Sequence, residues 1–379
     1  MTASASLPAG PDAAPPAAPL PSHIAAVIGE AGGWIGFDRF MALALYTPGL
    51  GYYSRGSSQF GAMPVGVKGG GGDFVTAPEL SPAFGATLAV QVADALRASG
   101  TDEVWEFGAG TGALAEQLLG ALGAQVLRYT IVDLSGSLRQ RQQMRLAPFG
   151  DKVRWLSELP DRFTGVVVGN EVLDAMPVQL LARVAGHWFE RGVALDAGGH
   201  FTWADRPTEQ RPPMEIAGEH DYLTETHAQG RAFAATLADR LERGVALLLD
   251  YGFPEAEYYH PQRHMGTVMC HRAHVADDDP LADVGDKDIT AHVDFTGIAL
   301  AAQDAGLEVL GYTSQAHFLY NCGLLDKLDA LPQVQRGLAL HLVHEHEMGE
   351  LFKVIALGRG LPADWLPVGF SRGDRSGRL

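Results

Sequence analysis

Short apolar runs alternate with stretches of helical periodicity through the middle of the chain. The runs at 103–107, 128–133, 165–169 and 245–250 predict strands, and the last two are continuously apolar. Continuous apolar runs are typical of parallel strands that are covered on both faces. The alternation of strand and helix from residue 101 onward therefore predicts an α/β fold built on a Rossmann-like sheet.

Residues 178–204 show a different pattern. Their β-rich runs are separated by Ala185-Gly186 and by Asp196-Ala197-Gly198-Gly199, which are hairpin signals. We therefore expect an inserted β-meander that forms part of a substrate lobe. Late in the chain, apolar runs at 307–312 and 351–357 predict a hairpin that closes the edge of the main sheet.

The ends of the chain are poor in core-forming residues. The first residues are rich in Ala and Pro, and such a composition favours disorder. Glycines crowd the loop at 61–72, which is typical either of a mobile lid over a ligand or of a flexible surface loop. Ser22 is a candidate N-cap for the first helix, and Ser81-Pro82 predicts the start of another. The expected organisation is a tail at 1–21, a helical segment with the lid at 22–100, a core at 101–177 and 241–358, an inserted lobe at 178–240 and a tail at 359–379.

The strand at 103–107 runs into a glycine turn, Glu106-Phe107-Gly108-Ala109-Gly110-Thr111-Gly112, and then into a helical stretch. Such a turn lets the backbone approach a ligand closely. Its G-x-G-x-G spacing differs from the dinucleotide pattern G-x-G-x-x-G. Glu106 would attract the cationic S-adenosylmethionine and repel a pyrophosphate. The turn therefore favours S-adenosylmethionine, with a dinucleotide or a purely structural turn as the alternatives.

A second acidic residue, Asp133, ends the strand at 128–133, 25 residues after Gly108. A carboxylate at this place can accept hydrogen bonds from both ribose hydroxyls of a nucleoside. Because S-adenosylmethionine and NAD both carry a ribose, Asp133 supports a nucleoside site without choosing between them.

Further polar residues follow the predicted strands at 165–169 and 245–250. Asn170 and Glu171 follow the first strand, and Asp174 would share a helical face with Glu171. Two carboxylates on one face suit a guanidinium, although Asn170 and Asp174 could equally cap a short helix. Tyr251 follows Asp250 at the end of the second strand, and His292 lies in a later loop, where a solvated surface position is the alternative reading.

Composition narrows the function classes. The net charge is −17 and the isoelectric point is near 5.2, which argues against general nucleic-acid binding and suits a basic protein substrate. Two cysteines give no disulfide scaffold, no apolar run is long enough to span a membrane, and no His, Cys, Asp or Glu spacing predicts a metal site. With no transit-like N-terminus, we expect a cytoplasmic protein.

Taken together, these segments resemble the MidA-type methyltransferases that depend on S-adenosylmethionine, whose mitochondrial members assemble respiratory complex I. The resemblance spans most of residues 22–358, in family order. It is carried by Gly49-Leu50-Gly51-Tyr52-Tyr53, residues 72–81, 106–112, 132–135 and 170–177, Asp250-Tyr251-Gly252, residues 288–295 and 315–319. The loop at 62–70 is longer than the family pattern, so its role and that of Lys68 stay open.

The resemblance implies a class I methyltransferase sheet and methylation of a protein nitrogen, for mitochondrial members an arginine of a complex I subunit. It implies S-adenosylmethionine as cofactor and S-adenosylhomocysteine as product. The sequence leaves the oligomeric state open, with a homodimer as one alternative. A small-molecule methyltransferase, a non-catalytic assembly factor and a nicotinamide-dependent oxidoreductase are the rival interpretations. The implied catalytic residues are Glu171, Asp174, Tyr251 and His292, and the implied cofactor residues are Thr76, Pro78, Glu106, Gly108, Ala109, Gly110, Thr111, Gly112, Asp133, Leu134, Ser135, Asn170 and Glu171.

Overall fold

A mixed sheet forms the centre of the molecule in the computed structural model, which describes residues 18–54, 76–133, 136–272 and 275–379. Across these residues its strand order is β15-β16-β10-β5-β2-β3-β4, and β14 (Val293–Asp294) pairs beside β10. The strands β4, β3, β2, β5 and β10 are parallel, whereas β16 and β15 are antiparallel. Their bounds are β2 (Glu103–Phe107), β3 (Arg128–Val132), β4 (Val153–Leu156), β5 (Phe163–Asn170), β10 (Leu241–Phe253), β15 (Glu308–Ser314) and β16 (Phe352–Arg359).

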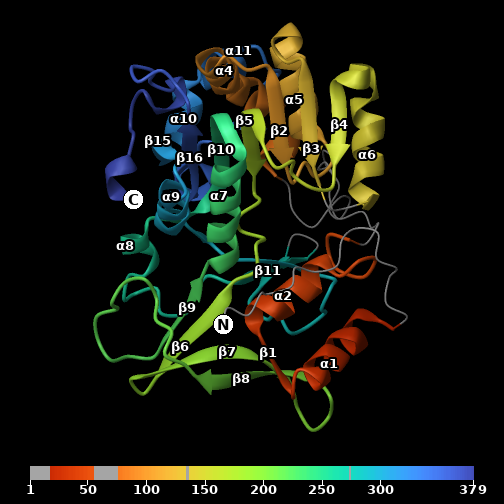
Figure 1. Ribbon diagram of the computed structural model, residues 1–379, viewed down its shortest axis with the longest axis vertical. Coiled ribbons are helices and arrows are strands. Elements are labelled where there is room, and N and C mark those ends of the chain that lie inside the picture. The colour runs from red at the N-terminus through yellow and green to blue at the C-terminus, as the bar shows by residue number, and fades with distance from the viewer. Residues whose placement is uncertain (1–17, 55–75, 134–135, 273–274) are drawn as a thin grey trace.

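Helices cover both faces of this sheet (Figure 1), as the continuous apolar runs predict. In β5, Val166 and Val168 pack into one core cluster, and Val167 packs into the other. The first cluster lies under α4 (Pro82–Ser99), α5 (Ala113–Leu122), α10 (Gln315–Asn321), α11 (Leu324–Asp329) and α12 (Gln333–Leu340). The second lies under α7 (Ala228–Arg240) and α9 (Phe295–Asp304). This layered arrangement confirms the predicted α/β fold built on a Rossmann-like sheet.

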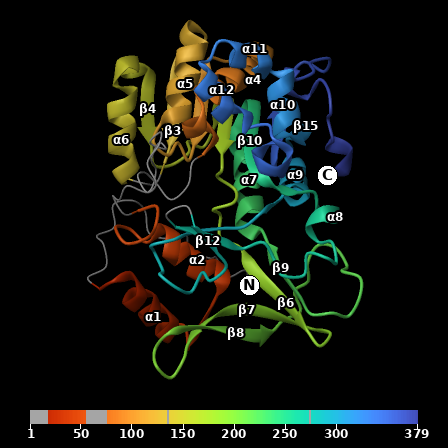
Figure 2. The same ribbon diagram turned by 180° about the vertical axis from the view of Figure 1, so that it is seen from behind.

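A second, antiparallel sheet builds a lobe beside the core, seen below the main sheet in Figure 1 and from behind in Figure 2. The expected meander is present as β6 (Gln179–Val184), β7 (His187–Leu195) and β8 (Phe201–Pro207). It is joined by β9 (Tyr222–Thr226) and by β1 (Trp34–Gly36) of the N-terminal segment. The helices α1 (Leu20–Glu30) and α2 (Phe37–Tyr46) share its apolar core.

The remaining helices include α3 (Ala77–Leu80), α6 (Gly136–Leu146) between the core strands β3 and β4, and α8 (Glu255–Tyr258). A small separate sheet is formed by β11 (Met269–Arg272), β12 (Val275–Asp277) and β13 (Asp288–Thr290). Among the helices of the described residues, none has both the length and the apolar character needed to cross a membrane.

Several local expectations differ from the structure. The first helix begins at Leu20 rather than at Ser22. Residues 359–379 pack onto the core instead of forming a loose tail: Phe370 is buried with its ring 5.4 Å from that of Phe318, and Arg375 pairs with Glu350. The helix α7, placed by its sequence range in the lobe, packs against the main sheet. The glycine-rich loop at 61–72 and most of the first tail lie outside the described residues.

Candidate functional site

The glycine turn after β2 uses backbone angles that other residues rarely adopt. Gly108, Gly110 and Gly112 have φ angles of 62°, 51° and 84°. A Cβ atom on Gly108 would also lie 3.0 Å from Cγ2 of Val172, closer than nearly all real contacts of this kind. The alternating glycines of the sequence are therefore a conformational requirement of this turn.

Glu106 lies beneath the turn as a buried carboxyl group. It is 1% exposed and accepts a hydrogen bond of 2.7 Å from the Tyr129 hydroxyl. Burial raises the pKa of Glu106 to about 8, although the Tyr129 hydrogen bond lowers it. A positive charge placed nearby would favour the ionised form of such a group.

Asp133, at the end of β3, is held by a side chain that sequence reasoning missed. Gln142 of α6 donates from Nε2 to Oδ2 of Asp133 at 2.8 Å and to the carbonyl oxygen of Gly110 at 2.9 Å. Trp155 donates from Nε1 to Oε1 of Gln142 at 2.9 Å. Gln142 is fully buried, and it ties the end of β3 to the glycine turn.

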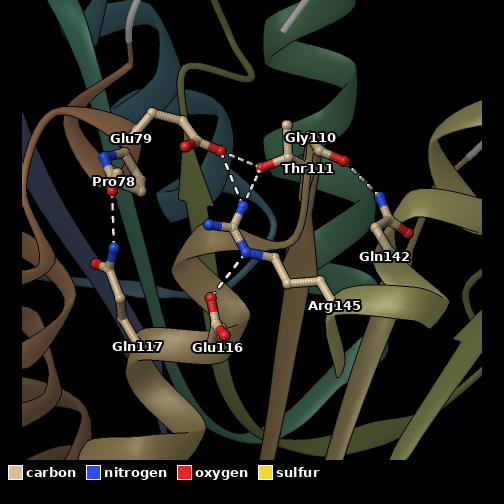
Figure 3. Close-up of polar contacts among 8 residues, drawn as sticks. All are labelled: Pro78, Glu79, Gly110, Thr111, Glu116, Gln117, Gln142 and Arg145. Carbon is tan, nitrogen blue, oxygen red and sulfur yellow. Dashed lines mark hydrogen bonds and ion pairs between the residues drawn. The ribbon is translucent and has the colours of Figure 1, made fainter. Parts of the chain in front are cut away.

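The segment Thr76 to Leu80 is fastened to the other side of the turn (Figure 3). Gln117 of α5 donates to the carbonyl oxygen of Pro78 at 2.7 Å and accepts from the Gly85 amide at 2.9 Å. Thr76 immediately precedes α3. The segment that carries Thr76 and Pro78 thus lies beside the helix that follows the glycine turn, and the wall that these two residues are expected to form stays a prediction.

Arg145 adds a second fastening (Figure 3). Its Nη1 donates to Thr111 Oγ1 at 2.6 Å and to Glu79 Oε1 at 3.0 Å, and its Nε donates to Glu116 Oε2 at 2.7 Å. Thr111 also donates to Glu79. No motif marks Gln142 or Arg145, and their one sequence signal is a pair of polar residues three positions apart on the helix that follows β3.

A second group of polar residues gathers where the neighbouring strands β5 and β10 end. Asn170 pairs with Leu249 across these strands and donates from Nδ2 to Oε1 of Glu171 at 2.7 Å. Glu171 has a φ of 54°, so the chain turns there and does not form a helix. The predicted helical face shared by Glu171 and Asp174 is therefore wrong, because a left-handed residue at 171 breaks the helical spacing.

Asp250 fixes the loop that carries these carboxylates. Its Oδ2 accepts hydrogen bonds from the backbone amides of Val172, Leu173 and Asp174 at 3.1, 2.8 and 3.2 Å. Three backbone donors on one oxygen atom orient the loop rigidly. Asp250 thus sets the geometry of the polar group at the ends of β5 and β10, a role that its place in the sequence does not reveal.

Three carboxyl groups, those of Glu171, Asp174 and Asp250, are crowded here. Burial, followed by the charge of Asp174, raises the pKa of Glu171 to about 8. Burial raises the pKa of Asp174 to about 6, against a hydrogen bond from Tyr251 that lowers it, and burial also raises the pKa of Asp250. Among the described residues, no lysine or arginine forms an ion pair with any of the three. This part of the molecule would gain stability from a bound cation.

Tyr251 and His292 lie at the margin of this cluster. Their ring centroids are 5.3 Å apart. Burial, followed by the charges of Arg263 and Lys353, lowers the pKa of His292 to about 4, so its imidazole is neutral at pH 7. Asp294 does not join His292, because it accepts from the Gly297 amide as the N-cap of α9.

Buried acceptor atoms without partners mark the same region. In the described part of the chain, Asn170 Oδ1, Asp174 Oδ1 and His292 Nδ1 make no hydrogen bond. Buried polar atoms are nearly always satisfied in native proteins. Such atoms beside three carboxyl groups can be satisfied by ordered water or by a ligand that donates hydrogen bonds.

Two tyrosines of the N-terminal segment lie against this cluster. The Tyr46 hydroxyl donates to the carbonyl oxygen of Ala175 at 2.7 Å, and the Tyr53 hydroxyl donates to Asp288 Oδ1 at 2.8 Å. Their rings stack with centroids 5.6 Å apart. Aromatic faces next to carboxylates are a common environment for a guanidinium.

The other residues predicted for the cofactor site are Ala109, Leu134 and Ser135. Leu134 and Ser135 lie outside the described residues, and Ala109 is buried within the glycine turn. Within the described ranges, no three His, Cys, Asp or Glu side chains converge on a point that could hold a metal ion.

Comparison with known proteins agrees with this geometry. The sequence profile of a family of S-adenosyl-L-methionine-dependent methyltransferases matches residues 87–313. A crystal structure from Burkholderia thailandensis, bound to S-adenosylhomocysteine, is 49% identical, with a TM-score of 0.89, and covers 95% of this chain and 96% of that one.

Curated relatives extend the likeness over most of the chain. The mitochondrial protein arginine methyltransferase NDUFAF7 of Danio rerio is 27% identical over 88% of this chain and 86% of its own length. The mitochondrial homolog from Caenorhabditis elegans is 27% identical over 84% of this chain and 81% of its own. These relatives are named as mitochondrial proteins, and this finding contradicts the cytoplasmic location expected from the sequence.

Proposed function

The chain belongs to the family of S-adenosyl-L-methionine-dependent methyltransferases, and from this premise we propose that it methylates an arginine side chain of a protein. The predicted cofactor and enzyme class are confirmed by the family match and by the related structure bound to S-adenosylhomocysteine. The named activity of the curated relatives supports arginine as the target. So does the acidic group at the ends of β5 and β10, formed by Glu171, Asp174 and Asp250, which we call the acceptor side. The family resemblance extends the proposal to a subunit of a respiratory complex.

The observation that carries this proposal is a group of three carboxyls, with Asp174 and Asp250 buried and Glu171 partly buried, that has no paired cation among the described residues. Glu171, Asp174 and Asp250 have no lysine or arginine partner among the described residues, and Asp174 keeps an unsatisfied oxygen. A guanidinium has five N–H donors in a plane and a permanent positive charge. Such a group answers both the charge and the missing hydrogen bonds.

The cofactor residues fit the expected ligand. When bound, S-adenosylmethionine supplies an electrophilic methyl group on a positively charged sulfur atom. In our proposal Asp133 accepts the ribose hydroxyls, Glu106 lies toward the positive end of the cofactor, and the glycine turn lets the backbone approach it. Thr76 and Pro78 form the opposite wall.

In the reaction, a guanidinium nitrogen forms a bond to the methyl carbon while the carbon–sulfur bond breaks, and its electron pair stays on sulfur. One proton leaves the nitrogen. Because the pKa of arginine exceeds 12, this proton departs only as the nitrogen attacks. Glu171 and Asp174 orient the guanidinium and are the first acceptors within reach, while Tyr251 and the neutral His292 line the margin. Alignment of the reacting atoms supplies much of the rate.

The test is transfer of a radiolabelled methyl group into a protein extract, followed by acid hydrolysis and separation of the amino acids. We expect the label in methylarginine. Label in a small soluble compound would instead support a small-molecule methyltransferase. No transfer to any fraction, despite binding of S-adenosylhomocysteine, would support a non-catalytic assembly factor.

A further inference from the structure

Gln142 contacts three parts of the cofactor side, although no motif marks it. Its amide group touches the glycine turn at Gly110, the strand-end carboxylate of Asp133 and the indole of Trp155. The side chain is fully buried. Both hydrogens of Nε2 and the oxygen of the amide are engaged, so the group has no polar atom left for solvent.

The partners of Gln142 leave only one orientation for its amide. Trp155 Nε1 can only donate, so the amide oxygen has to face the indole. The amino group then faces the Gly110 carbonyl and the Asp133 carboxylate, and both of these can only accept. If the amide were turned by 180°, its oxygen would face two acceptors, the Gly110 carbonyl and the Asp133 carboxylate. Its amino group would then face the N–H donor of Trp155. The Trp155 contact thus determines which donor Asp133 meets.

We infer that Gln142 is a positioning residue for the cofactor: it orients Asp133 toward the ribose and locks that carboxylate to the glycine turn. Gln142 supplies one donor to Asp133, and a carboxylate, which has about four acceptor sites, can accept from more than one donor at a time. The same side chain prevents Gly110 from moving independently of β3 (Figure 3). The inference rests on the proposed assignment of Asp133 to the ribose.

The experiment is a double-mutant cycle in which one change is made in the protein and the other in the ligand, and calorimetry measures the affinity of each combination. The ligands are S-adenosylhomocysteine and its analogue without the ribose 2′-hydroxyl, and the proteins are the wild type, Gln142→Leu and a control, Gln143→Leu. Gln143 is the exposed neighbour of Gln142 on the same helix. A structural role would weaken both ligands equally, whereas an orienting role weakens mainly the ligand that carries the hydroxyl.

We expect the wild type and the control to bind the deoxy analogue about 10-fold more weakly than S-adenosylhomocysteine. In Gln142→Leu this discrimination should fall to about 2-fold, and the KM for S-adenosylmethionine should rise about 10-fold with kcat nearly unchanged. Should Gln142→Leu fail to fold, Trp155→Phe removes the orienting donor while keeping an aromatic ring, and it should reduce the discrimination in the same direction.

Two results would overturn the inference. Undiminished discrimination in a folded variant would show that Gln142 does not orient Asp133. Absence of discrimination in the wild type would remove Asp133 from the ribose and the inference with it. Arginine methylation, which is measured separately in the extract, would survive either result.

Discussion

The two halves of the site differ in how well their polar groups are satisfied. On the cofactor side, Gln142 has partners for both Nε2 hydrogens and for its amide oxygen, and Glu106 accepts from the Tyr129 hydroxyl. On the acceptor side, Asn170 and Asp174 each keep a buried oxygen atom that no described residue hydrogen-bonds. A satisfied site can be rigid before its ligand arrives, whereas an unsatisfied one carries a free-energy cost that only the right ligand removes. The difference indicates that substrate selection takes place on the acceptor side.

The largest expected effect comes from Glu171→Gln, which tests whether the halves act separately. We expect methyl transfer to fall by at least about 100-fold, because the guanidinium loses a charge partner during alignment. The affinity for S-adenosylhomocysteine, measured by calorimetry, should change by less than about 3-fold. Glu158→Gln, at an exposed acid, serves as the control. Full transfer by a variant that still binds S-adenosylhomocysteine would remove Glu171 from the mechanism.

Tyr129→Phe should give the opposite pattern. It removes the donor to Glu106 and leaves a buried carboxyl without that hydrogen bond. We expect the free energy of unfolding to fall by about 1–3 kcal/mol and S-adenosylhomocysteine to bind about 10-fold more weakly. Denaturant titration and calorimetry measure the two effects, with kcat at saturating cofactor largely retained. A fall in kcat with unchanged cofactor affinity would contradict the division into two halves.

The pH dependence of stability follows from the carboxyl groups with raised pKa. Glu171 has a pKa of about 8 when folded and an ordinary value of 4.5, so the folded state holds its proton more tightly. The stability of the empty protein should therefore be highest below pH 4.5 as far as this group is concerned, and it should decline as pH rises toward 8. We expect Tm to fall by roughly 5 °C between pH 5 and 9, and by less in Glu171→Gln. A Tm that rises over this range in both proteins would contradict the assignment.

The smallest effect is expected for Arg145→Leu. Arg145 is partly exposed, and exposed ion pairs contribute little to stability, so the unfolding free energy should change by less than about 1 kcal/mol. Its contacts with Thr111 and Glu79 nevertheless hold the Thr76 segment to the glycine turn. The KM for S-adenosylmethionine should rise about 3-fold, measured in the transfer assay. A KM equal to that of the wild type would show that the contacts of Arg145 do not contribute to cofactor binding.

Local patterns predict the core of this fold well. The continuous apolar run around Val167 implies a strand covered on both faces, and Ser81 caps α4 as expected, accepting from the Ala83 amide. The spacing of Gly108, Gly110 and Gly112 has a direct counterpart in their positive φ angles. These features depend on residues that are close in the sequence.

Long-range contacts are what the sequence could not predict. Gln142 meets Gly110 and Trp155 only because α6 packs beside the glycine turn, and no local pattern encodes that packing. The helical face proposed for Glu171 and Asp174 is wrong because Asp250, distant in sequence, holds the loop through backbone amides. The C-terminal residues pack through Phe370 against Phe318, which composition alone does not show.

In the protein without substrate, we expect Glu171 on the acceptor side to hold a proton where the positive charge of the substrate will lie. The test is calorimetry at pH 7, in which a peptide that contains arginine is titrated into the protein already bound to S-adenosylhomocysteine. Repeating it in buffers of different ionisation enthalpy gives the number of protons released on binding. We predict binding with release of about one proton, because Glu171 ionises as the guanidinium arrives, and at least 10-fold weaker binding of the matching citrulline peptide. Equal binding of the citrulline peptide, or binding of arginine without proton release, would contradict the account.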